Sequence, residues 1–257
     1  MFRLTTHRLF QRLRFSPAAR RLPSQCAVCK SWPTEPVCQP CVARFLTGGL
    51  RCSLCAVALP PDLSLGLAAP RDVCFDCIKQ PPPVDHTLVA VDYAYPWSAL
   101  ITQYKFADHP GWASFFAQLM LADADLRSVF TDLDAEDVIV PIPLSTQRLQ
   151  TRGFNQAWEL ATQLVAQSGS RGSLDATLLW RVKNTPPQTL LKRQARLDNV
   201  RGAFQIDPLR AASLAGKRVV LVDDVMTSGA SLFTAASVLR AAGAVHITGV
   251  VLARTPL

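Results

Sequence analysis

Apolar and polar positions alternate along most of the chain in a pattern that predicts strands and helices in turn. From residue 86 onward, short runs rich in β-branched and aromatic residues predict strands, while longer amphipathic stretches predict helices. The predicted strands cover 86–95, 137–143, 177–181, 203–206, 218–223 and 245–253, and the predicted helices cover 97–106, 112–124, 154–167 and 229–242. This alternation favours an α/β fold with a largely parallel sheet and helices on both of its faces.

The first 80 residues lack this periodicity and instead contain all of the cysteines. The eight cysteines form four C-x-x-C pairs, whose spacing lets two thiolates from one tight turn bind the same tetrahedral ion. The pairs are Cys26/Cys29, Cys38/Cys41, Cys52/Cys55 and Cys74/Cys77. Because two pairs complete a four-thiolate site with no open position, the sequence predicts two structural zinc ions.

The spacing leaves two questions about these cysteines open. The sites can be sequential, with the first two pairs holding one ion and the last two the other, or they can be interleaved. The alternative to zinc is a disulfide scaffold, which is typical of secreted proteins, but the chain has no secretory signal. Metal binding would supply much of the folding free energy of this proline-rich segment.

The distribution of charge sets the first 24 residues apart from the rest of the chain. The formal net charge is +8, and residues 1–24 carry six arginines and no acid, so the remainder is close to neutral. This tail can contact nucleic acid or an anionic membrane surface, serve as a transit peptide, or form a short docked amphipathic helix. We therefore expect a basic tail or helix (1–24), a double zinc module (25–80) and an α/β domain (81–257), with the run Pro81-Pro82-Pro83 as a stiff linker.

The overall composition narrows the class of protein. Apolar residues make up 49% and charged residues 18% of the chain, which is typical of a globular protein. No stretch approaches the 18 or so apolar residues that a transmembrane helix needs. We expect a soluble, cytoplasmic protein without a transmembrane segment.

The strongest chemical signal in the α/β region is a strand, an acidic pair, a loop of small residues and a helix. The apolar run 219–222 ends at Asp223 and Asp224, and the predicted helix begins near Gly229. Backbone N–H groups at a helix N-terminus favour a phosphate, and carboxylates one step earlier can accept hydrogen bonds from ribose hydroxyls. The predicted ribose 5-phosphate site comprises Asp223, Asp224, Thr227, Ser228, Gly229, Ala230 and Ser231. A purely structural interpretation is that the two acids cap the loop.

Other nucleotide-binding motifs are absent from the sequence. No G-x-x-x-x-G-K-[ST] or G-x-G-x-x-G occurs, and the nucleophile elbow that Ser231 would need is broken by Phe233. The sequence also shows no segment that would clearly bind a purine, pyrimidine or orotate ring.

Residues 219–231 closely resemble the phosphoribosyl pyrophosphate signature of type I phosphoribosyltransferases. The whole chain resembles the ComF/GntX family of competence-related proteins, in which the same pieces follow one another. These pieces are a basic N-terminal helix, C-x-x-C pairs, Tyr104-Lys105-Phe106, Pro141-Ile142-Pro143-Leu144, Arg152-Gly153-Phe154-Asn155-Gln156, Arg196 and Asn199 followed by Ala203-Phe204, and the signature loop.

The resemblance implies roles for particular residues. Asp223 and Asp224 would contact the ribose hydroxyls, and residues 227–231 would hold the 5-phosphate. The candidates for binding the diphosphate are Lys105, Arg148, Arg152, Asn155 and Arg196, with Lys192 beside the last. Guanidinium groups suit this task because they donate in pairs and keep their charge. Magnesium would arrive with the diphosphate itself.

The resemblance also implies a function in natural transformation, with imported single-stranded DNA and a helicase as partners. Two hypotheses from different classes follow. The protein is a phosphoribosyltransferase or a protein that depends on phosphoribosyl pyrophosphate, or it is a nucleic-acid-binding zinc protein with a vestigial or regulatory phosphoribosyl site. A nucleobase-salvage transferase is a further alternative, weakened by the missing acceptor pocket.

Overall fold

The computed structural model describes residues 24–32, 35–46, 48–60, 72–106, 110–182 and 202–256. Contacts divide the chain into two compact units, Met1–Phe45 and Leu46–Leu257. Nearly all of the predicted basic tail, residues 1–23, lies outside the described residues. In the described parts of the first unit, one short helix, α1 (Gln39–Phe45), follows the turn that carries the first cysteines.

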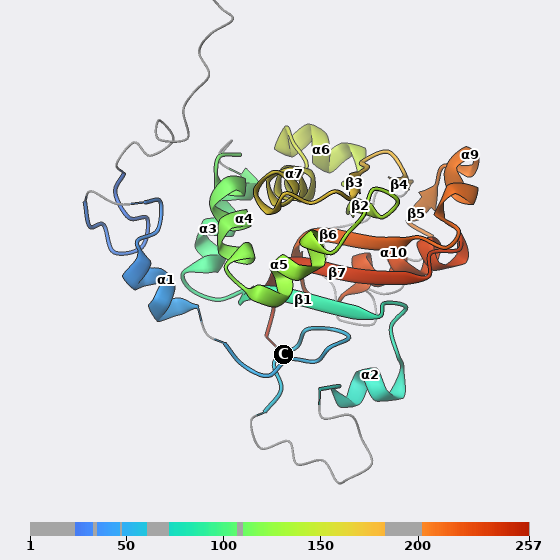
Figure 1. Ribbon diagram of the computed structural model, residues 1–257. Coiled ribbons are helices and arrows are strands. Elements are labelled where there is room, and N and C mark those ends of the chain that lie inside the picture. Colours follow the sequence, from blue (N-terminus) through green and yellow to red (C-terminus); the bar gives the residue numbers. More distant parts are fainter. Residues whose placement is uncertain are drawn as a thin grey trace, which may run out of the picture. The chain divides into compact units, whose positions relative to one another are not determined.

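The second unit is built on a five-stranded sheet in which every pairing is parallel (Figure 1). Its strands lie in the order β1 (His86–Asp92), β7 (His246–Arg254), β6 (Arg218–Met226), β2 (Val138–Pro141) and β3 (Ser173–Leu174). β6 and β7 are nine residues long, and six residues of β6 and eight of β7 are buried, as expected for apolar strands covered on both faces.

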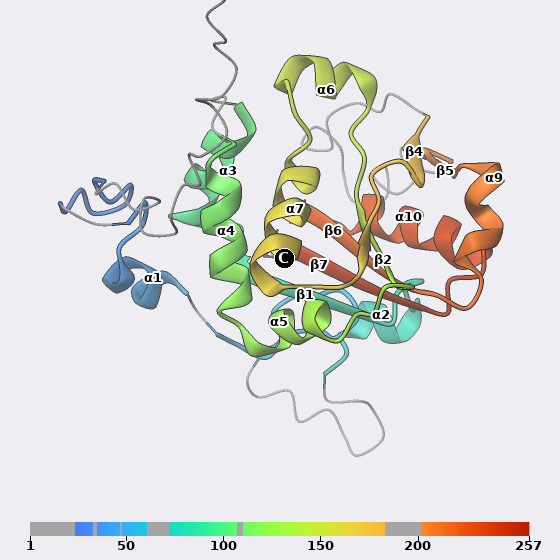
Figure 2. The same ribbon diagram turned by 45° about the horizontal axis from the view of Figure 1, so that its top comes forward.

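Helices cover both faces of this sheet, so the predicted fold class is confirmed (Figures 1 and 2). One face packs against α4 (Trp112–Leu121), α5 (Ala124–Thr131) and α7 (Gln156–Ser168). The other face packs against α10 (Ala230–Ala241). The remaining helices are α2 (Phe75–Lys79), α3 (Trp97–Phe106), α6 (Thr146–Arg152), α9 (Pro208–Ala211) and the 3-10 turn η3 (Ala212–Leu214).

Two predicted strands form a separate element. Residues 177–181 and 203–206 correspond to β4 (Leu179–Arg181) and β5 (Phe204–Ile206), which pair antiparallel as a two-stranded sheet. The helix predicted over 112–124 ends earlier, because the Asp123 carboxylate accepts hydrogen bonds from the amides of Asp125 and Leu126 and starts α5. α6 was not predicted, since none of its residues is buried and its sequence shows no apolar face.

The connections after two neighbouring strands, β2 and β6, run to opposite faces of the sheet. Helix α7, which comes after β2 and α6 along the chain, packs on one face, whereas α10, which follows β6, packs on the other. Because β2 and β6 are neighbours and parallel, the loops after them diverge from the same edge. In open α/β sheets this switch point is where ligands bind.

Candidate functional site

The loop after β6 is shaped by one glycine. Residues 227–229 connect β6 directly to α10, and Gly229 has a φ of 78°. A Cβ at this position would lie 2.4 Å from Cε2 of Phe233 and 2.6 Å from Cε of Met226. Ser228 Oγ accepts a hydrogen bond from the Ala230 amide at 3.4 Å. The left-handed backbone conformation therefore favours glycine at this turn, which leads into the N-terminus of the twelve-residue helix α10 at the carboxyl end of β6.

The two acids at the end of β6 are held in an environment that opposes double ionisation. Asp224 is buried, with 7% of its surface exposed, and Asp223 is partly buried. The Asp223 carboxylate accepts a hydrogen bond from the Asp224 amide at 2.8 Å. Burial, with the adjacent charge of Asp224 as the second cause, raises the pKa of Asp223 to about 7. The pair is poised to gain from a ligand that donates hydrogen bonds.

Lys105 lies directly against this acidic pair. Its Nζ is 3.1 Å from Oδ1 of Asp224, and both side chains are largely buried. Next to it on α3, the buried Tyr104 hydroxyl donates to the Gln156 carbonyl at 2.7 Å, which fixes α3 against the start of α7. Lys105, predicted from sequence as a diphosphate ligand, forms an ion pair with Asp224 in this structure.

Two arginines, Arg148 and Arg181, interact electrostatically with the acidic pair. Burial, followed by repulsion from Arg152, lowers the pKa of Arg148, and Asp223 and Asp224 attract it. Burial, followed by repulsion from Arg148, lowers the pKa of Arg181 to about 10. Two guanidinium groups that repel each other near a sheet edge favour the binding of an anion.

Arg181 was not among the residues predicted from sequence. It lies on β4, 5.3 Å above the ring of Phe204 on β5, so its position depends on the pairing of two short strands. The one available signal was a cation within a predicted strand of otherwise mainly apolar residues, 177–181, and such a signal is weak.

Of the other residues predicted to bind diphosphate, Arg152 and Asn155 form hydrogen bonds within the protein. Arg152 donates to Oε1 of Gln156 at 2.8 Å and lies 5.2 Å above the Phe106 ring. Asn155 caps α7 by accepting from the Ala157 amide and donates to the Ile142 carbonyl after β2. Asn155 therefore holds the loop in place. Arg196 and Lys192 lie outside the described residues.

The eight cysteines form two four-sulfur clusters. One cluster contains Cys26, Cys29, Cys38 and Cys41, and the other contains Cys52, Cys55, Cys74 and Cys77. Within each cluster the sulfur atoms lie within 4.8 Å of one another. All eight are free cysteines, so the disulfide alternative and the interleaved pairing are both wrong in this structure.

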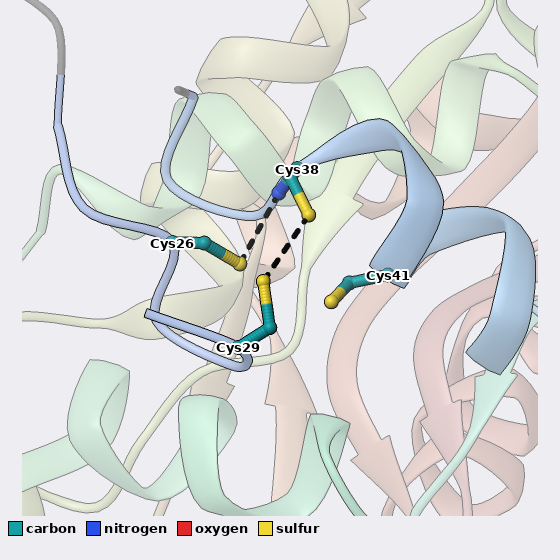
Figure 3. Close-up of side chains that lie close together, drawn as sticks. All are labelled: Cys26, Cys29, Cys38 and Cys41. Carbon is teal, nitrogen blue, oxygen red and sulfur yellow. Dashed lines mark hydrogen bonds between the residues drawn. The ribbon is translucent and has the colours of Figure 1, made fainter. Parts of the chain in front are cut away.

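The geometry of each cluster fits zinc. In the first, the four side chains converge on one point, with the Cys29 and Cys38 sulfurs 3.6 Å apart (Figure 3). Sulfurs around a tetrahedral zinc ion are about 3.8 Å apart, since each Zn–S bond is about 2.3 Å. The Cys38 amide donates to the Cys26 sulfur at 3.4 Å, and in the second cluster the Cys74 amide donates to the Cys52 sulfur at 3.3 Å. In both clusters the first cysteine of the second C-x-x-C pair thus donates its amide to the first sulfur of the first pair, and each cluster can bind one zinc ion through four thiolates.

The clusters differ in their surroundings. The first lies in the Met1–Phe45 unit. In the second, Cys52, Cys55 and Cys77 belong to the hydrophobic core that also contains residues of β6, β7 and α10. The second cluster is therefore part of the face of the sheet that α10 covers.

Comparisons with known proteins agree with this architecture. Residues 134–256 match the family model described as a phosphoribosyl transferase domain. The chain is 32% identical over 210 residues to the DNA utilization protein YhgH of Salmonella typhimurium, covering 79% of this chain and 90% of that one. The chain belongs to the ComF/GntX family. Competence protein F of Haemophilus influenzae is 32% identical over 175 residues, with 68% of this chain and 75% of that protein covered. Competence protein ComFC of Bacillus subtilis is 27% identical over 221 residues, with coverages of 82% and 80%.

Family membership explains the combination of elements that the sequence predicted, a phosphoribosyltransferase domain together with C-x-x-C pairs. Among the described parts of the chain, none of the helices has the length and apolar character that crossing a membrane requires.

Proposed function

We propose that the α/β unit of this ComF/GntX protein binds phosphoribosyl pyrophosphate with magnesium. The observation that carries the proposal is the acidic pair at the end of β6, beside a glycine-dependent helix N-terminus and within the field of Arg148 and Arg181. The acids would accept hydrogen bonds from the ribose hydroxyls, the loop amides would bind the 5-phosphate, and the arginines would face the diphosphate.

This arrangement supports ligand binding more directly than it supports transfer to a particular acceptor. Departure of diphosphate from the ribose would be assisted by cations that stabilise the leaving charge. Lys105 lies 3.1 Å from Oδ1 of Asp224 and would help to orient that carboxylate toward the ribose hydroxyls that donate to it.

Calorimetry with phosphoribosyl pyrophosphate and magnesium tests the proposal. The double variant Asp223→Asn/Asp224→Asn keeps the shape of the site but removes two charged acceptors, so affinity should fall roughly 100-fold or more. The control Asp134→Asn/Glu136→Gln removes two exposed carboxylates elsewhere and should bind as the wild type does. Folded wild-type protein that gives no binding heat would refute the proposal.

We also propose that the protein contacts single-stranded DNA. Its relatives are named for DNA utilization and competence. Beside the second cysteine cluster, Phe75 on α2 is 63% exposed, with the Lys79 ammonium 4.3 Å above its ring. An exposed ring next to a cation is the combination on which nucleobases stack without sequence preference.

Fluorescence titration with a single-stranded oligonucleotide at two salt concentrations tests this second proposal. Phe75→Ala should weaken binding roughly fivefold or more at both salt concentrations, because base stacking is lost. Lys79→Gln should mainly reduce the salt dependence. Leu209→Ala removes another exposed apolar side chain, 94% exposed, and should change neither quantity. Equal binding by Phe75→Ala and wild type would contradict the proposal.

A further inference from the structure

Arg254 connects the second cysteine cluster to the loop after β6. It is the last residue of β7 and is buried, with 4% of its surface exposed. Its Nε donates to the carbonyl of Cys55 at 2.9 Å. Its Nη1 donates to the carbonyl of Met226 at 3.2 Å and also to that of Thr227. One guanidinium group therefore binds a metal-site turn on one side and the start of the candidate phosphate loop on the other.

The rigidity of the guanidinium group couples the positions of the carbonyl groups that it binds. The group is planar and rigid, and its donors point in fixed directions, so a shift of one acceptor must move the others or break a hydrogen bond. Burial makes a broken bond costly, because no bulk water is available to replace the acceptor. The Met226 carbonyl also accepts from the Thr255 amide at 3.0 Å, so this end of β6 is held from two sides by β7 and the residue after it.

The Cys55 carbonyl depends in turn on the state of its cluster. Cys55 belongs to a tight turn in which the Cys52 amide donates to the Val57 carbonyl and the Ala56 amide donates to the Cys52 carbonyl. Four thiolates bound to one ion fix this turn. Without the ion, the thiolates repel one another or become protonated, and the turn loses its common anchor.

We propose that Arg254 is a positioning residue through which metal occupancy of the second cysteine cluster sets the affinity of the loop after β6 for its phosphorylated ligand. The inference rests on the proposed binding of phosphoribosyl pyrophosphate by that loop. It assigns the second cluster a role in ligand binding beyond local folding, and it assigns no such role to the first cluster, which lies in a separate compact unit.

The first experiment compares two arginines that bind backbone carbonyls at opposite ends of β7. Arg240 donates to the carbonyls of Ala244 and Val245 just before β7 begins. Arg254→Lys should lower the affinity for phosphoribosyl pyrophosphate and magnesium roughly tenfold, because a single ammonium cannot reach both sides at once. Arg240→Lys should lower stability without changing affinity. Equal affinities of the wild type and a folded Arg254→Lys variant would overturn the proposal.

The second experiment removes one metal ligand from each cluster. Cys29 and Cys74 are the most exposed members of their clusters, so serine is tolerated best there. Cys29→Ser and Cys74→Ser should each lower the zinc content of the purified protein by about one ion per chain. Only Cys74→Ser should weaken binding of phosphoribosyl pyrophosphate, again roughly tenfold. In an Arg254→Lys background, Cys74→Ser should add little further loss, since both changes break the same connection.

Hydrogen exchange separates failure of this inference from failure of the proposed function. In ligand-free protein, the amides of residues 227–230 should exchange faster in Cys74→Ser and in Arg254→Lys, but not in Cys29→Ser. If the wild type fails to bind phosphoribosyl pyrophosphate, the proposed function is wrong, and the same exchange pattern would still support the coupling. Unchanged exchange at 227–230 in both Cys74→Ser and Arg254→Lys would overturn the coupling whatever the ligand.

Discussion

The two ends of the parallel sheet differ in how their charged side chains are paired and in the direction of their pKa shifts. Near the amino ends of the strands, acids are paired with arginines. Arg218 donates from Nε to Asp137 at 3.1 Å, and Arg240 donates to Asp85 at 2.5 Å. Although burial opposes ionisation there, the hydrogen bond from Arg218 keeps the pKa of Asp137 below its usual value. The Ile247 amide, followed by Arg240, lowers the pKa of Asp85 in the same way.

At the carboxyl ends of the strands, the pKa shift of the acidic side chain has the opposite direction. Burial and a neighbouring acid raise the pKa of Asp223, while burial and neighbouring arginines lower the pKa of Arg148 and that of Arg181. Each of these groups is held where ionisation costs free energy. Fold stability alone does not select such an arrangement, whereas an absent ligand that supplies hydrogen-bond donors and negative charge would relieve it. The amino end therefore serves stability, and the carboxyl end is the candidate site.

The largest expected change is a loss of stability from a substitution near the amino ends of the strands. Asp137→Ala leaves Arg218 without its buried partner and should lower the free energy of unfolding by about 3 kcal/mol, since breaking a buried pair is costly even when one partner is partly exposed. Urea denaturation measures the loss. Affinity for phosphoribosyl pyrophosphate, determined where the variant is folded, should not change. A large loss of affinity would mean that the two ends are not independent.

Two glycines with nearly equal φ angles give a matched test of the difference between the amino and carboxyl ends of the sheet. Gly229, at the candidate site, and Gly216, just before β6, have φ values of 78° and 76°. Gly229→Ala should cost about 2 kcal/mol and weaken ligand binding, because backbone strain adds to contacts with Phe233 and Met226. Gly216→Ala meets no atom within 4 Å and should cost about 1 kcal/mol of strain with unchanged affinity. Equal losses in the two variants would show that the contacts at Gly229 relax.

The affinity of the carboxyl-end site should depend on pH. With a pKa of about 7, Asp223 is mostly protonated at pH 6 and mostly ionised at pH 8. Because the ionised form accepts hydrogen bonds from ribose hydroxyls, affinity should rise about tenfold between these values. Calorimetry of Asp223→Asn at the same two pH values supplies the control, since any remaining dependence belongs to the ligand phosphates. A wild type with the same pH dependence as this variant would exclude Asp223 as the titrating group.

The smallest effect is a gain of stability at the site itself. The folded-state pKa of Asp223 lies above its unfolded value, so its ionisation destabilises the fold as pH rises from about 4 through 7, and not below. Asp223→Asn should therefore unfold at a higher temperature than the wild type at pH 8, and the difference should shrink at pH 5. An advantage of equal size at both pH values would point to packing as its cause.

Local patterns in the sequence predicted much of this molecule. The run 219–222, the acidic pair and Gly229 are contiguous, so their strand, loop and helix follow from neighbouring residues. The C-x-x-C pairs likewise form their clusters through short turns, and the structure selects the sequential pairing.

What sequence reasoning missed depends on contacts between distant segments. The pairing of Lys105 with Asp224 brings together residues from α3 and β6, and Arg181 reaches the site through a separate two-stranded sheet. No periodicity or spacing records such contacts. For the same reason, nothing in the second pair of C-x-x-C motifs distinguishes them from the first, although their cysteines pack with β6, β7 and α10.

The position of β7 has a consequence for biosynthesis. Among the described strands it is the last along the chain, yet it lies between β1 and β6, and it carries Arg254 at its end. While the ribosome is still translating, β1 and β6 have no strand between them, and their open edges can pair with other chains. Assembly of the sheet, of the candidate site and of the Arg254 connection must therefore wait for the same segment, 246–254, to emerge.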